Sequence, residues 1–291
     1  MYRRAGTVYF NKINGEIMKR QLKISMLAAT MLSGFITTTN AANTVDFSNY
    51  SDPNPTFNIT QVNGDGNVVR AEGGFFFGGP GVPLTGNNNV FTITQSGSNN
   101  GTAIASNGSG LTSVGASLTN SKINTSATGN GNDIQVQGTY HDSITNNDSE
   151  VINTNINGNN NQALAQFSGS NEHLNAAIMG NQNNVYQQVG VYGSISNNNT
   201  SNVMVTGNSN TVLSYFDNGN LNNDTSITNG TGNSVLDAAQ GNSNTMRTTV
   251  NGNNNIAGNY LASGDGNQST VNVHGNSNTV TGLIGTNTFG T

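Results

Sequence analysis

The residues of this chain that could support acid–base or metal chemistry are few and scattered. The only histidines are His141, His173 and His274, and there is no cysteine, so thiol chemistry and cysteine-bound zinc are unavailable. Asp217 and Asp237 come nearest to the paired acids of a glycoside hydrolase, but nothing in the pattern marks either as buried. We therefore expect no catalytic residue, no metal ligand and no cofactor, and we do not expect an enzyme.

The residue type with regular spacing is asparagine, whose amide can both donate and accept hydrogen bonds. A glycine followed three residues later by asparagine recurs along the chain, often eleven or twenty-two residues apart. The pairs are Gly64 and Asn67, Gly86 and Asn89, Gly97 and Asn100, Gly129 and Asn132, Gly158 and Asn161, Gly180 and Asn183, Gly207 and Asn210, Gly219 and Asn222, Gly230 and Asn233, Gly241 and Asn244, Gly252 and Asn255, Gly264 and Asn267, and Gly275 and Asn278. This recurrence indicates a repeat architecture with a unit of about 22 residues, divided into halves.

The residues around these pairs predict short strands. Small or apolar residues stand five places after many of the glycines and two places before others, with polar residues between them, which is the period of a strand with one buried face. Glycine provides the positive φ of a turn, and asparagine tolerates the left-handed region. Helices are disfavoured at this density of glycine and asparagine.

These elements predict an all-β, amyloid-competent β-solenoid with two strands and two turns in each coil of about 22 residues. Stacked coils would place each asparagine above its equivalent, so that side-chain amides form a ladder along the stack. We assign residues 57–284 to the solenoid, with a loop insertion at 70–84 and longer coils within 108–207. Phe75, Phe76 and Phe77 in the insertion either dock a partner or cover an open end of the solenoid.

The N-terminal region has the pattern of an export signal. Lys19, Arg20 and Lys23 precede an apolar stretch from Ile24 to Ile36, and we expect cleavage after Ala41. The predicted organisation is an over-long start at 1–17, a signal peptide at 18–41, an N-terminal segment at 42–56, the solenoid at 57–284 and a tail at 285–291. The apolar stretch is shorter than the ~20 residues of a membrane span, so no stable membrane insertion is expected.

Charge and cysteine content restrict the partners and the source of stability. Removal of residues 1–41 leaves three basic and thirteen acidic residues, which disfavours binding to nucleic acid. A secreted chain without cysteine has no disulfides, so backbone hydrogen bonds and stacked side chains must hold the fold together.

The ends of the predicted solenoid favour self-association. Residues 280–291 contain no charge and no evident cap, so the last coil would expose unpaired backbone groups. Head-to-tail stacking would cover both ends and extend into a filament. The acids of the repeat region are interpreted either as gatekeepers against aggregation or as solvated turn residues: Asp133, Asp142, Asp148, Asp217, Asp224, Asp237 and Asp265.

The repeat resembles the curlin family, the subunits of bacterial curli fibres, whose pattern is Gln-x-Gly-x-x-Asn-x-Ala. The closest copy contains Gln95, Gly97 and Asn100. The alanine position is matched at Ala163 and Ala257, whereas the glutamine position is usually aliphatic, and Gln61, Gln166 and Gln240 stand one place off.

The resemblance implies a subunit, major, minor or nucleating, of a secreted amyloid fimbrium on the surface of a Gram-negative bacterium. It also implies self-association with other fibre subunits, export through an outer-membrane secretion pore with a chaperone, and a role in adhesion and biofilm. The alternative is a monomeric β-solenoid adhesin that binds carbohydrate or protein. Tyr186, Tyr192 and Tyr215 are its candidate stacking platforms, or else they pack across strands.

Overall fold

The computed structural model describes residues 33–38, 43–46, 50–51, 54–62, 64–73, 84–108, 117–140, 146–148, 150–167, 169–189, 196–216, 219–220, 222–239, 243–261 and 267–284. All regular structure in these ranges is β-strand, arranged in three parallel sheets that we call A, B and C. No helix that could cross a bilayer is present in this part of the chain. The expected all-β class is confirmed.

Sheets A and B are the long sheets of the molecule. Sheet A has eleven strands: β1 (Ser33–Thr38), β4 (Thr56–Val62), β7 (Val90–Ser96), β10 (Lys122–Thr128), β13 (Val151–Ile152), β14 (Asn155–Asn157), β17 (Ala176–Met179), β20 (Val203–Asn208), β23 (Ser226–Thr231), β25 (Thr245–Asn251) and β27 (Gln268–His274). Sheet B has ten: β2 (Thr44–Asp46), β5 (Val68–Gly73), β8 (Gly101–Gly108), β11 (Asp133–Tyr140), β15 (Gln162–Phe167), β18 (Asn184–Val189), β21 (Thr211–Phe216), β24 (Ser234–Ala239), β26 (Ile256–Leu261) and β28 (Thr279–Ile284).

Sheet C is narrower and does not extend along the whole stack. Its seven strands are β3 (Tyr50–Ser51), β6 (Leu84–Asn87), β9 (Ser117–Thr119), β12 (Asn146–Asp148), β16 (Gly169–Ser170), β19 (Ser196–Asn197) and β22 (Gly219–Asn220).

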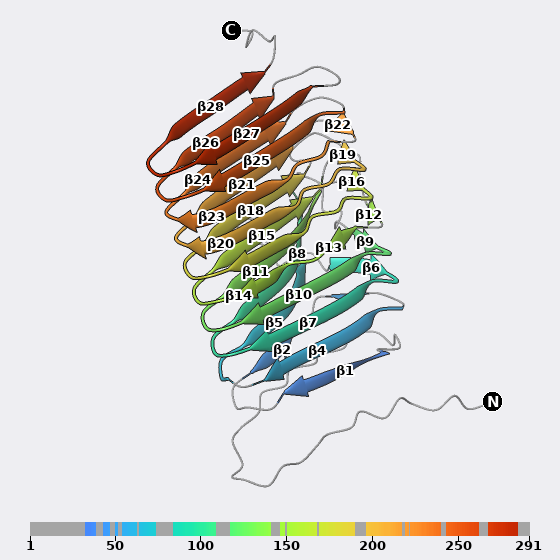
Figure 1. The fold of residues 1–291 in the computed structure, drawn as a ribbon. Coiled ribbons are helices and arrows are strands. Elements are labelled where there is room, and N and C mark those ends of the chain that lie inside the picture. Colours follow the sequence, from blue (N-terminus) through green and yellow to red (C-terminus); the bar gives the residue numbers. More distant parts are fainter. Residues whose placement is uncertain are drawn as a thin grey trace, which may run out of the picture.

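The chain visits the sheets in turn, and we call one passage a coil. Each coil begins with a strand in sheet A, turns into sheet B, and returns to sheet A beside the strand with which it began. Figure 1 shows the coils rising from the blue N-terminal strands to the red C-terminal strands. Because strands in neighbouring coils run in the same direction, each coil is held to the next by a parallel ladder of backbone hydrogen bonds.

The third strand distinguishes the early coils from the late ones. Coils from β1 to β22 each place a short strand in sheet C, which the two-strand expectation does not include. After β22 the described chain alternates between sheets A and B alone, in the pairs β23–β24, β25–β26 and β27–β28. These last coils have the spacing of about 22 residues that the repeat predicts: Ser234 pairs with Ile256.

Two expected boundaries can be placed on the fold. Strand β1, which pairs with β4, lies inside the expected signal peptide at 18–41. The expected insertion at 70–84 overlaps the end of β5 and the start of β6, and residues 74–83, with Phe75, Phe76 and Phe77, lie outside the described residues.

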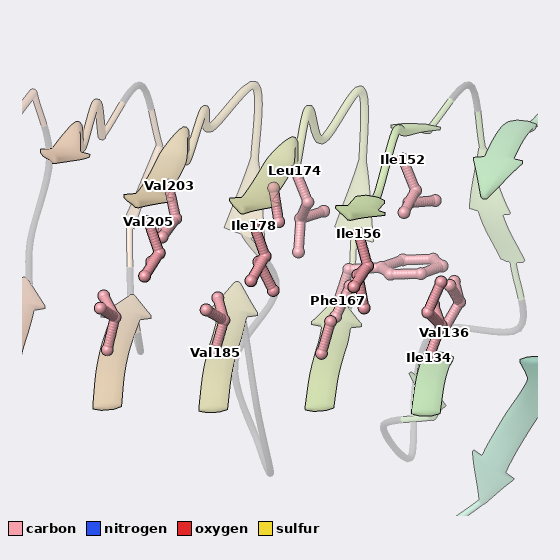
Figure 2. Packing of buried hydrophobic residues seen from close by; sticks show 14 of the residues in the cluster. Ile134, Val136, Ile152, Ile156, Phe167, Leu174, Ile178, Val185, Val203 and Val205 are labelled. Atoms are coloured by element: carbon pink, nitrogen blue, oxygen red, sulfur yellow. The ribbon is translucent and has the colours of Figure 1, made fainter. Parts of the chain in front are cut away.

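The core is a thin layer between sheets A and B. Figure 2 shows Ile134, Val136 and Val185 of sheet B pointing toward Ile156 and Ile178 of sheet A. These side chains are buried because successive residues of a strand point to opposite faces of the sheet. Most of the apolar residues aligned on the repeat are buried in this layer, and Val280 in the last strand is 36% exposed.

The core changes character along the stack. One inward column of sheet A reads Phe57, Phe91, Ile123, Ile152 and Leu174, and then continues as Ser201, Asp224, Met246 and Ser269. A column of sheet B changes in the same way, from Val136 and Ala165 to Gln187, Ser214, Asp237 and Asn259. The N-terminal coils therefore have an apolar interior, whereas the later coils bury polar groups that need hydrogen-bond partners.

Candidate functional site

The first feature that could serve self-assembly is a continuous ladder of asparagines, buried in all but its last rung, at the turn between sheets A and B. Its rungs are Asn43, Asn67, Asn100, Asn132, Asn161, Asn183, Asn210, Asn233, Asn255 and Asn278. At a typical step, Asn210 donates its backbone N–H and its side-chain Nδ2 to Asn183 Oδ1, both at 3.0 Å. Asn183 Nδ2 in turn donates to Gly207 O at 2.8 Å. We call this the A–B ladder.

The backbone of each turn explains the Gly-x-x-Asn spacing. Gly180 has φ +129°, and Gln182, two residues later, has φ 57° in the left-handed region. A Cβ built on Gly180 would lie 1.8 Å from the carbonyl oxygen of Gly207 in the next coil. Glycine is required here because the neighbouring turn stacks directly on it and because its φ is unfavourable for other residues.

The remaining Gly-x-x-Asn pairs form a second ladder, at the return from sheet B to sheet A. Its stacked rungs are Asn89, Ser121, Glu150, Glu172, Asn199, Asn222, Asn244 and Asn267. Gly86 and Gly219, which precede two of these rungs, lie in strands of sheet C, and Gly241 and Gly264 lie outside the described residues. The half-repeats of the sequence thus divide into two separate ladders, and we call this one the return ladder.

The return ladder is less regular than the A–B ladder. The Asn222 backbone N–H donates to Asn199 Oδ1 at 2.8 Å, but the buried Asn222 side chain has no hydrogen-bond partner among the described residues. Two consecutive rungs, Glu150 and Glu172, are buried acids in the position of an amide. A buried amide or acid stabilises the fold only when its hydrogen bonds are made.

Burial has a marked electrostatic effect at Glu172. Loss of hydration raises the pKa of this carboxyl to about 8, although hydrogen bonds from Asn199 oppose the shift. Asn199 N donates to Glu172 Oε2 at 2.9 Å, and Asn199 Nδ2 lies 3.3 Å from Oε1. The carboxyl is therefore largely neutral at pH 7.

Glutamine stacking is present in the first coils. Gln61 pairs in register with Gln95, and Gln61 Nε2 donates to Gln95 Oε1 at 2.8 Å inside the core. Gln61 stands one place further from its glycine than Gln95 does, as the sequence indicates, but the strand register still stacks the two glutamines. Gln166 lies partly exposed on β15, and Gln240 is outside the described residues.

The later coils contain a chain of buried polar side chains between sheets A and B, which we call the polar seam. Its members are Gln187, Ser201, Ser214, Asp224, Ser226, Asp237, Thr248, Asn259 and Ser269. The interpretation of Asp224 and Asp237 as gatekeepers or solvated turn residues is wrong, because both carboxyls are fully buried.

The alternation of inward and outward residues along β24 could have revealed that Asp237 is buried. Asp237 stands two residues after the core residue Val235 on one strand, so both must share a face. The suggested partner Asp217 lies outside the described residues, as do Asp142 and Asp265, and Asp133 is partly exposed on β11. Burial removes Asp237 from contact with any external substrate, which disfavours the glycoside-hydrolase interpretation.

The ends of the A–B ladder differ in their hydrogen bonding. At the C-terminal end, Asn278 Nδ2 turns back to His274 O at 3.2 Å, whereas inner rungs reach the glycine carbonyl of the next coil. At the other end, Asn43 Oδ1 accepts from Asn67 N at 2.9 Å. Among the described residues, β27 and β28 are the last strands of sheets A and B.

The outer face of sheet B carries tyrosines. Tyr186, Tyr215 and Tyr260 point outward, because the residues on either side of each are buried or lie on the inner face. Tyr215 and Tyr260 share one column with Ala238 between them, and Tyr186 donates to Gln166 Oε1. Sequence reasoning missed Tyr260, and Tyr192 lies outside the described residues.

The histidines do not converge. His274 is exposed at the end of β27, His173 is exposed between β16 and β17 several coils away, and His141 lies outside the described residues. Within the described ranges, no three His, Cys, Asp or Glu side chains are grouped as a metal ion would require.

Comparison with known proteins gives no independent assignment. No protein-family model matches the chain, and no curated protein matches it. A functional interpretation therefore depends on the residues and geometry described above.

Proposed function

We propose that the protein is a secreted structural subunit, major, minor or nucleating, of a curli-like amyloid surface fibre used in adhesion and biofilm. In this proposal the coils form a β-solenoid, and copies add end to end by templated strand stacking. The observation that carries the proposal is the A–B ladder, which runs from Asn43 to Asn278 with a backbone N–H to side-chain Oδ1 hydrogen bond at every step. A second copy offers the groups that continue this pattern.

The repeated register defines the junction. Within the chain, Thr44 pairs with Val68 and Ile256 pairs with Thr279, and in each pair the first residue donates its backbone N–H to the asparagine carbonyl of the next coil. Continuation across a junction places Asn43 of one copy over Asn278 of another. Thr279 of that copy then lies beside Thr44, and its N–H can reach the Asn43 carbonyl.

Engineered cysteines test this junction, because the chain contains no native cysteine. Neighbouring strands lie about 4.8 Å apart, within the Cα range of a disulfide. We expect the variant T44C/T279C to form disulfide-linked oligomers when assembled material is oxidised. The matched control T44C/I256C places the thiols about two strand spacings apart and should give none.

Two outcomes would contradict the proposal. Purified protein that stays monomeric for days at micromolar concentration, with no seeded rise in thioflavin fluorescence, would refute templated assembly. Fibres that form without T44C/T279C cross-links would refute the end-to-end register. A gene neighbourhood with a dedicated secretion pore and chaperone would support the proposed export route.

A monomeric carbohydrate-binding adhesin is the second candidate, and the tyrosines on the outer face of sheet B favour it. Tyrosine rings on a flat surface give apolar contact area together with a polar hydroxyl. The outward residues of β18, β21, β24 and β26 include no charged side chain. Glycan-array binding by the monomer that is lost in Tyr215→Ala, but kept in Met204→Ala on sheet A, would favour this function over the fibre.

A further inference from the structure

A run of hydrogen bonds that starts at Gln187 leads along the polar seam to the carboxyl group of Asp224. Gln187 Nε2 donates to Ser201 Oγ at 3.1 Å. The hydroxyl oxygens of Ser201 and Ser214 lie 2.9 Å apart, and Ser214 Oγ donates to Asp224 Oδ2. Because the Gln187 amide can only donate at this contact and the Ser214 hydrogen goes to the carboxyl, Ser201 donates to Ser214. Asp224 is therefore the acceptor at the end of this run.

A second run of hydrogen bonds starts at Ser269, at the other end of the polar seam, and leads to the carboxyl group of Asp237. Ser269 Oγ donates to Asn259 Oδ1 at 3.1 Å, and Asn259 Nδ2 donates to Thr248 Oγ1. Thr248 then donates its only hydroxyl hydrogen to Asp237 Oδ1. Asp237 is the acceptor at the end of this second run.

Ser226 contacts both carboxyl groups, but its hydroxyl has only one hydrogen, which is too few for a hydrogen bond to each acid. Its hydroxyl oxygen lies 3.3 Å from Asp224 Oδ1 and also contacts Asp237 Oδ2. A hydroxyl has one hydrogen, and an ionised carboxylate can only accept. If both acids were ionised, one of these buried contacts would be between two oxygens with no hydrogen between them. One acid must therefore supply the missing hydrogen.

We propose that the folded protein holds one proton on the Asp224–Asp237 pair at neutral pH, and that this proton is taken up when the later coils fold. The polar seam is thus a pH-responsive element that favours the folded coils in acid. This inference concerns the folding of one chain and does not depend on fibre formation.

The electrostatics agree with the hydrogen count. Burial raises the pKa of Asp224 to about 6 and raises that of Asp237 well above its ordinary value, where the neighbouring Asp224 charge adds to the effect. Acids with raised folded-state pKa values bind more protons when folded, so their contribution to stability is present at low pH and is lost as pH rises. The loss begins near pH 4 and continues through and above pH 6.

Among the residues that the structure describes, no other charged group faces the pair. Tyr215 on β21, Arg247 on β25 and Tyr260 on β26 point outward, away from the interior. The remaining inward residues of β20, β23, β24 and β27 among the described residues are uncharged. The pair therefore responds to pH through its own proton.

Infrared spectroscopy tests for the proton directly. The experiment uses the E172Q background, which removes a further buried acid with a raised pKa. We expect the folded protein at pH 7 to show the carbonyl band of a protonated carboxyl, which disappears on unfolding in denaturant. The band should be lost in Asp237→Asn and in Asp224→Asn, but kept in the exposed control Asp65→Asn. Absence of the band from the folded background protein would overturn the proposal.

Stability against pH supplies the second test. Each asparagine variant carries the missing hydrogen in its side-chain amide, so the hydrogen count of the seam is preserved. Around pH 7 we expect the folding equilibrium constant of the E172Q protein to fall with rising pH, by up to about tenfold per pH unit, and that of the asparagine variants to fall less steeply. Equal slopes in the E172Q protein and in both variants would overturn the proposal.

Discussion

The strongest test of the ladder compares two asparagines in one coil that the sequence cannot distinguish. Asn222 and Asn233 each end a Gly-x-x-Asn motif, and each is 1% exposed. Asn233 Nδ2 donates to Asn210 Oδ1 at 3.0 Å and to Gly252 O at 2.8 Å, and its Oδ1 accepts two bonds from Asn255. The Asn222 side chain makes no hydrogen bond among the described residues.

The two alanine variants should therefore differ widely in stability. Asn233→Ala leaves a buried carbonyl, a buried N–H and a side-chain amide with lost partners, at about 1–3 kcal/mol for each group, and so should cost about 3–9 kcal/mol. Asn222→Ala removes an amide that makes no hydrogen bond to the described part of the chain, and so should cost about 1 kcal/mol or less.

Urea unfolding of freshly purified monomer, followed by circular dichroism, measures both values. The comparison assumes an unchanged m-value, which reports the surface exposed on unfolding. Equal losses in the two variants would show that the ladder hydrogen bonds do not set the stability of these coils, and would refute the reasoning from the stacked amides.

Three further outcomes follow from single residues. Gly180→Ala should prevent stable folding of its coil, because the added Cβ would lie 1.8 Å from Gly207 O. Circular dichroism should show a loss of β-sheet signal, and a native spectrum would contradict the prediction. Glu172→Gln should remove one contribution to the pH dependence. With a folded pKa of about 8, the wild-type carboxyl loses about 1.4 kcal/mol of stability per pH unit between about pH 4.5 and 8, so urea midpoints should fall less steeply with pH in the variant, where only Asp224 and Asp237 still contribute. Phe91→Ala should cost about 3–5 kcal/mol in urea unfolding, because Phe91 is fully buried and stacks on Phe57 at a centroid distance of 4.9 Å; a loss below about 1 kcal/mol would contradict the packing argument.

The strand-and-turn pattern could be predicted because it depends on local chemistry. Gly180 and Asn183 have types that suit a tight turn with positive φ, and period-two alternation marks the inward residues of each strand. Both signals lie within a few residues of each other, so no knowledge of distant contacts is needed to find them.

Other features could not be read from the local pattern. The split between the A–B ladder and the return ladder depends on which half-repeat stacks on which, and Glu150 and Glu172 replace the expected amide without leaving a recognisable motif. Alternation from Val235 places Asp237 on the inner face, but Asp224 and Asp237 were interpreted as surface acids because acids are seldom fully buried. Their partners come from different coils, and the register that brings them together appears only when the strands are paired.

The change from an apolar interior around Phe91 and Ile123 to a polar one around Asp224 and Asn259 has a calorimetric consequence. Exposure of apolar surface raises the heat capacity on unfolding, whereas exposure of polar surface lowers it. The N-terminal coils therefore carry most of the curvature of stability with temperature and weaken first on cooling. The C-terminal coils contribute a flatter profile, so the two halves of one continuous stack respond differently to cold.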